Sequence, residues 1–174
     1  WHDPDFNAWL RTGVSEGWVE MLTSAYAQQI MPFVTDDMNN WSVSTEKDMV
    51  QYVYNYDAKV AWVPERVWLA SGNYPDAGLS DSWLGDNWTQ HGVEAVILDD
   101  SPHLDSVGYY KSTKITWMNN GSGITLKVIP IYNDFVGQVQ YDTDAAKSTI
   151  SNTGDYGIAN YGTDWEASAE MNEH

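Results

Sequence analysis

Carboxylates that follow apolar runs are the residues of this 174-residue chain whose type and spacing suit chemistry. Such acids occur at four places along the sequence: Glu20, Glu65, Asp99–Asp100 and Asp164. A single acid in this position is ordinarily a helix cap or a solvated loop residue. Four such acids together favour a catalytic role over a purely structural one. Two carboxylates at one end of a sheet can divide the roles of nucleophile and acid/base.

Short apolar runs rich in β-branched residues predict the strands that would position these acids. The runs fall at residues 18–23, 60–63, 94–98, 115–118, 124–131 and 156–161. Segments with helical character lie between them, at residues 25–33, 45–56, 80–91 and 143–151. Since parallel neighbours need a crossover connection, this alternation predicts a parallel-stranded α/β fold. No repeat or linker divides the chain, so residues 1–174 are expected to belong to a single domain.

In parallel sheets and barrels, chemistry gathers where the strands end at their carboxyl side. We therefore expect Glu65 and Asp164 to project toward the same end of one sheet, with Glu20 approaching the same mouth.

The composition excludes several classes of function. Eight Lys and Arg against 25 Asp and Glu give a net charge of -17, which repels nucleic acids and anionic bilayers. The absence of Cys removes disulfides, thiolate metal sites and cysteine nucleophiles. The four His form no HxH or HxxxH pair, so neither a metal nor a cofactor is expected. No signal peptide or membrane span is visible, which favours a cytoplasmic location; the oligomeric state stays open.

Four segments resemble motifs of glycoside hydrolase family 57. VAWVPERVW at residues 60–68 resembles its nucleophile motif, in which a W-x-x-E-R core ends a barrel strand. GVEAVILDDSPHL at 92–104 resembles the next strand, which commonly ends in two aspartates with a histidine shortly after. GWVEMLTSAY at 17–26 resembles the G-x-[LV]-E motif, and YGTDWEAS at 161–168 resembles the D-x-E motif of the acid/base. The resemblance covers roughly residues 15–170, with all four motifs in the family's order.

This resemblance implies an α-glucan-active enzyme, either a retaining hydrolase or a 4-α-glucanotransferase, on an incomplete (β/α)7-type barrel. Its substrate would be an α-glucan or a maltooligosaccharide. The implied catalytic residues are Glu65 as nucleophile and Asp164 as acid/base. The implied substrate-binding residues are Glu20, Trp62, Asp100 and His103. The ten Trp and eleven Tyr suit this reading, because their rings stack on sugars as well as packing in cores.

The sequence departs from the family pattern in two places. The opening H-x-H-Q-P motif is absent, which implies that the start of the catalytic domain lies outside this chain and that the chain alone is a poor catalyst. The D-x-E segment continues into Ala-Ser-Ala-Glu instead of a glycine-containing stretch.

Two other functions stay open at this point. One is a glucan-binding relic with aromatic platforms and no catalysis. The other is a metal-dependent polysaccharide deacetylase that would use Asp99, Asp100 and His103, although the second pair of histidines typical of such sites is missing.

Overall fold

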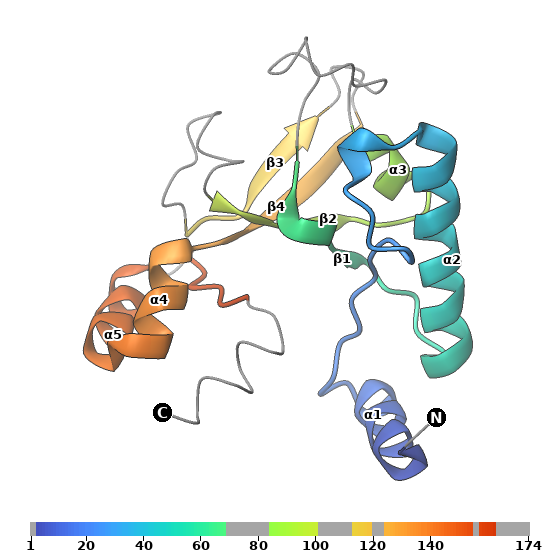
Figure 1. Cartoon of the computed structure of the whole chain (residues 1–174). Helices are drawn as coiled ribbons and strands as arrows, with labels where there is room; N and C mark the ends of the chain where they lie inside the picture. The colour runs from blue at the N-terminus through green and yellow to red at the C-terminus, as the bar shows by residue number, and fades with distance from the viewer. Residues whose placement is uncertain (1–2, 69–83, 101–112, 120–123, 155–156, 163–174) are drawn as a thin grey trace. The chain divides into compact units, whose positions relative to one another are not determined.

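A computed structural model describes residues 3–68, 84–100, 113–119, 124–154 and 157–162 (Figure 1). The described helices are α1 (Pro4–Glu16), α2 (Asp36–Tyr54), α3 (Gly85–Thr89), α4 (Asn133–Tyr141) and α5 (Thr143–Asn152). Two short 3-10 helices are η1 (Met31–Phe33) and η2 (Pro64–Arg66). The strands are β1 (Val60–Trp62), β2 (Ala95–Asp99), β3 (Thr116–Asn119) and β4 (Thr125–Ile131). The predicted α/β class is confirmed.

These strands form a four-stranded sheet in the order β1-β2-β4-β3. β1 and β2 are parallel, with Val60 beside Ala95 and Trp62 beside Ile97. β3 runs antiparallel to β4 (Figure 1), because the connection from Asn119 to Thr125 is too short for the crossover that a parallel pair requires. β3 is thus the antiparallel exception to the predicted parallel arrangement, and the described strands do not confirm the predicted barrel.

The chain divides into two compact units, which are described separately. Unit 1 contains residues 1–97 and 117–127, and unit 2 contains residues 98–116 and 128–174. In unit 1, α2 is capped by Thr35, whose hydroxyl accepts a hydrogen bond from the Met38 amide, and it buries Val43 and Val50. The side chain of Trp88 on α3 is fully buried in the same unit.

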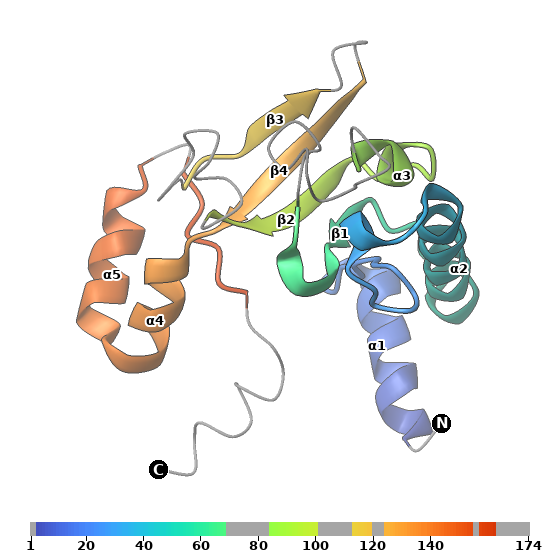
Figure 2. The same cartoon turned by 45° about the horizontal axis from the view of Figure 1, so that its top comes forward.

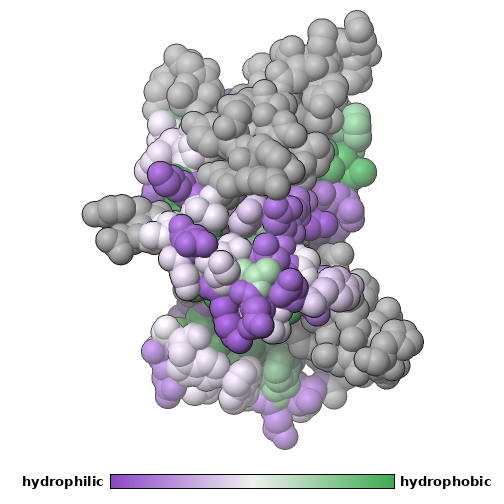
Figure 3. Space-filling view, turned by 90° about the vertical axis from the view of Figure 1, so that its left-hand side faces the viewer, coloured by the Kyte–Doolittle hydropathy of each residue, from purple (hydrophilic) through white to green (hydrophobic). Residues whose placement is uncertain are grey.

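In unit 2, α4 and α5 lie side by side (Figure 2), and the Thr149 hydroxyl bonds the Gln138 side-chain oxygen at 2.6 Å. Phe135 and Ala146 are the buried side chains of this pair. Among the residues coloured in Figure 3, hydrophilic and near-neutral ones predominate. No helix in the described ranges has both the length and the apolar character that a bilayer crossing requires.

The segment predicted as a helix at 25–33 is instead a loop that ends in η1. The Ser42 main-chain oxygen accepts the Tyr26 amide, and the Ser42 hydroxyl accepts the Ala27 amide, both at 3.1 Å. Gln28 has a positive φ of 51°, which a continuing right-handed helix excludes. Hydrogen bonds from this segment to Ser42 on α2 therefore take the place of the hydrogen bonds that a helix at 25–33 would form within itself.

Other boundaries also differ from the prediction. α2 begins at Asp36 rather than at residue 45, and α1 and α4 were not predicted. The strand predicted at 18–23 is reduced to one bridge between Thr23 and Ala61. Residues 157–161 contain no strand, and α3 covers only part of the helix predicted at 80–91, whose first residues lie outside the described ranges.

Candidate active site

The turn after β1 carries Glu65, the predicted nucleophile. Val63 is buried, and Pro64 starts the 3-10 turn that the Arg66 amide closes by donating to the Val63 carbonyl at 2.8 Å. Glu65 and Arg66 both have left-handed backbone, with φ of 51° and 56°. For residues other than glycine this conformation costs on the order of 1–3 kcal/mol each, and such strain is concentrated at functional sites.

Trp62 and Arg66 flank Glu65 in this turn. The Arg66 guanidinium carbon lies 5.9 Å from the centroid of the Trp62 ring, within cation–π range. Trp62 is half-buried, whereas Glu65 is exposed. The turn thus has an exposed glutamate, and its arginine lies over the half-buried Trp62 ring.

The residues after the Thr23 bridge support the end of β1. The Trp62 amide donates to the Thr23 carbonyl at 2.9 Å, and the Ser24 hydroxyl donates to the Trp62 carbonyl at 2.8 Å. The Gln28 side-chain amide then donates to the Ser24 hydroxyl at 3.0 Å. Sequence reasoning missed Ser24 and Gln28; the signal available was the polar Thr23-Ser24 pair that follows the apolar run at 18–22.

Glu20 lies toward the other end of β1. The parallel bridge places Thr23 beside Ala61, so Glu20 is level with Ala58, ahead of the strand, whereas Glu65 follows it. Burial raises the pKa of Tyr56, and the negative charge of Glu20 and its hydrogen bond with Tyr56 raise it further. The register therefore does not bring Glu20 to the same end of β1 as Glu65, contrary to expectation.

Asp100 follows β2 and belongs to unit 2. Its side chain is 1% exposed, and its Oδ1 accepts the amide of Asn133, the first residue of α4, at 3.2 Å. A carboxylate at this position is stabilised by the positive end of the helix dipole. The described contact is thus structural, which leaves the predicted substrate contact of Asp100 as a prediction.

Two predicted site residues, His103 and Asp164, lie outside the described residues, as does Glu166 beside Asp164. The prediction that Glu65 and Asp164 share one end of the sheet therefore stays a prediction. Among the residues that the structure covers, no three His, Cys, Asp or Glu side chains gather closely enough to hold a metal ion.

Comparison with solved structures supports the fold. The chain is similar to a 4-alpha-glucanotransferase from Thermococcus litoralis, with a TM-score of 0.75 and 21% identity over 94% of this chain and 24% of that one. It is also similar to a GH57-type branching enzyme from Pyrococcus horikoshii, with a TM-score of 0.62 and 17% identity over 77% of this chain and 25% of that one. The alpha-amylase AmyC from Thermotoga maritima gives a TM-score of 0.59 and 12% identity over 80% of this chain and 24% of that one.

This chain thus spans about a quarter of the length of each of these proteins. No curated protein sequence is close enough to be counted as a relative. A sequence profile of the family described as Glycosyl hydrolase family 57 matches residues 1–159, which include the strained turn at Glu65. The chain therefore belongs to glycosyl hydrolase family 57.

Proposed function

We propose that this chain carries catalytic residues of a retaining α-glucan-active enzyme, either a hydrolase or a 4-α-glucanotransferase. The observation that carries the proposal is the exposed Glu65 on a strained turn after the carboxyl end of the parallel strand β1. Membership of glycosyl hydrolase family 57 supports it, as do structural neighbours named as a glucanotransferase, a branching enzyme and an amylase.

In the proposed mechanism, the Glu65 carboxylate attacks the anomeric carbon while Asp164 gives its proton to the leaving glycosidic oxygen. The bond between sugar and leaving group breaks as the glycosyl ester on Glu65 forms. Asp164 then removes a proton from the acceptor, which is water for a hydrolase or a glucan hydroxyl for a transferase. The acceptor displaces Glu65, so the second inversion restores the original configuration.

Residues of the family-like motifs other than the two catalytic acids would position the substrate. Trp62 would stack on a sugar ring, since its half-buried ring adjoins the turn. Asp100 and His103 would accept and donate hydrogen bonds to sugar hydroxyls. Glu20 keeps a substrate-binding role only as a proposal, because its described partner is Tyr56.

The test removes the proposed nucleophile, Glu65, by substitution and then supplies azide as an external nucleophile. In an N-terminally extended chain that carries the H-x-H-Q-P motif, Glu65→Gln should lower turnover of maltoheptaose by about 10³-fold or more, because an amide cannot form the ester. Glu94→Gln, at another exposed glutamate of unit 1, should keep normal turnover. In Glu65→Ala, added azide should restore turnover and yield a glycosyl azide of inverted anomeric configuration, because only one displacement occurs.

Three results would contradict the proposal. Near-normal turnover by Glu65→Gln would move the nucleophile elsewhere. Maltoheptaose binding without any product from the extended chain would favour the glucan-binding alternative. Activity lost on adding a chelator would favour the metal-dependent deacetylase.

A further inference from the structure

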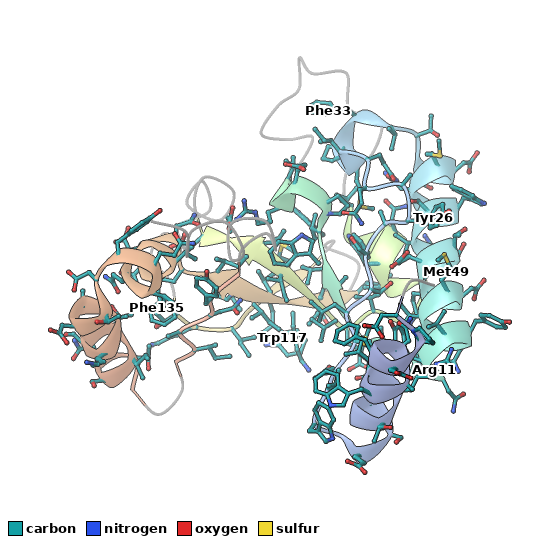
Figure 4. All side chains as sticks on the ribbon, turned by 60° about the horizontal axis from the view of Figure 1, so that its bottom comes forward. Arg11, Tyr26, Phe33, Met49, Trp117 and Phe135 are labelled. Carbon is teal, nitrogen blue, oxygen red and sulfur yellow. The ribbon has the colours of Figure 1, made fainter. Side chains whose placement is uncertain are left out.

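A groove of about 720 Å³ lies in unit 1, between α1 and the carboxyl-terminal end of α2. Arg11 and Ser15 line it from α1, and Tyr52, Tyr54 and Tyr56 line it from the end of α2 and the residues that follow. Figure 4 shows Arg11 beside the last turns of α2. Because Tyr56 precedes β1 while Glu65 follows it, the groove is separate from the candidate nucleophile.

A local feature of the backbone contributes to the shape of this groove. Asn55 ends α2 in a left-handed conformation, with φ of 52°, and thereby turns the chain toward Tyr56. The next residue, Tyr56, is half-buried and lines the groove. The end of α2 and the turn after it therefore bring Tyr52, Tyr54 and Tyr56 to the same groove.

The lining has the chemistry of a carbohydrate site. Tyrosine rings offer flat apolar faces for the C–H faces of sugar rings, together with hydroxyls that donate and accept hydrogen bonds. Tyr52 is 89% exposed, so its ring is available to a ligand. Arg11 supplies a planar set of donors suited to neighbouring hydroxyls.

Charge indicates a neutral ligand. No carboxylate lines the groove, and its one cationic side chain, Arg11, stands in a chain of net charge -17 that repels anions. The volume falls within the range of about 300–1,000 Å³ that is typical of small-molecule sites.

We propose that this groove is a second binding site for an α-glucan chain, apart from the Glu65 turn. The choice of an α-glucan rests on the proposed function, whereas the location of the site rests on the groove alone. Such a site would hold the polysaccharide on the protein while another part of the same chain reacts, and thereby raise the local substrate concentration.

Amide NMR shifts and titration calorimetry with maltoheptaose test this proposal on the Glu65→Gln chain, so that the ligand is not consumed. We expect shifts at residues 11–15 and 52–56 that cellohexaose does not produce. Tyr52→Ala should weaken binding about tenfold, because an aromatic platform is lost. Tyr141→Ala is the matched control, since Tyr141 is 77% exposed on α4 in unit 2 and should leave binding unchanged.

The outcomes separate the two proposals. Shifts confined to residues 62–66 would overturn the groove site and keep the Glu65 proposal. Shifts at the groove with no azide rescue at Glu65 would keep the site and overturn the catalytic assignment. No shift at the groove, or equal binding by Tyr52→Ala and Tyr141→Ala, would overturn the groove site.

Discussion

Asp57 anchors the entry to β1 through two lysines. Its carboxylate lies 2.7 Å from Lys47 on α2 and 2.6 Å from Lys59, and Lys47 also donates to the Ala58 carbonyl at 3.0 Å. Hydrogen bonds from Lys47 and then Lys59 lower the pKa of Asp57 to about 2. The hydrogen bond with Asp57 is also the main cause that raises the pKa of Lys59. The two pKa shifts therefore agree that the charged forms of Asp57 and Lys59 attract each other.

We predict that Asp57→Asn destabilises the fold in a pH-dependent way. The folded pKa lies below the ordinary value of 3.8, so the stabilisation is present above about pH 4 and is lost as the pH falls toward 2. At neutral pH the free energy of unfolding should fall by about 0.2–1 kcal/mol per ion pair, since the carboxylate is 55% exposed.

Urea unfolding at a series of pH values from neutral to about 2 measures this effect. The control is Asp144→Asn, whose i,i+3 pair with Lys147 is almost fully solvated and should contribute less. A difference between wild type and Asp57→Asn that stays constant down to the lowest pH would contradict the ion-pair account.

At the scale of elements, helix ends decide which segments become helical. α1 begins at the Asp3 cap with Pro4 in its first turn and ends at Gly17, whose φ is 79°. These are ordinary start and stop signals, so α1 was predictable from the sequence although it was not predicted. α4 was less visible, because Gly137 interrupts its apolar spacing.

We predict opposite effects for alanine at two glycines. Gly17→Ala should destabilise the chain by about 1–2 kcal/mol, because an L side chain is strained in the left-handed region. Gly137→Ala should stabilise it by about 0.5–1 kcal/mol, because it lies inside α4. An added Cβ meets nothing within 4 Å at either position, so the effects are conformational. Thermal unfolding measures both, and equal effects of the same sign would refute this explanation.

At the scale of the whole molecule, a net charge of -17 on 174 residues opposes compaction. Salt screens this repulsion over a Debye length of about 10 Å at 0.1 M and about 3 Å at 1 M. We predict that the thermal unfolding midpoint rises by several degrees, about 1 kcal/mol of stability, between about 0.05 M and about 1 M NaCl.

Sucrose, a non-ionic stabiliser, serves as the control for general solvent effects in this comparison. A variant with four exposed aspartates changed to asparagine should show a smaller rise of the unfolding midpoint with NaCl than the wild type. The four aspartates are Asp5, Asp37, Asp134 and Asp144. A midpoint that is flat or falls with NaCl would show that local ion pairs, such as those of Asp57, outweigh the global repulsion.

The sequence by itself determined the α/β class, the strands β1, β2, β3 and β4, and the placement of Glu65 after β1. Short apolar runs rich in β-branched residues suffice for these features, and β2 is buried along almost its whole length. The resemblance carried by VAWVPERVW was confirmed as membership of glycosyl hydrolase family 57.

Only the tertiary structure decided how neighbouring segments meet. Bonds from Ser42 replaced a predicted helix with the loop that carries Ser24 and Gln28, and the Thr23–Ala61 register separated Glu20 from Glu65. The left-handed backbone at Glu65 and Arg66 was equally invisible in sequence. Each of these features depends on residues that are distant in the chain, which supply hydrogen bonds or keep the backbone in a strained conformation. Local secondary-structure propensity carries no information about such contacts or such strain.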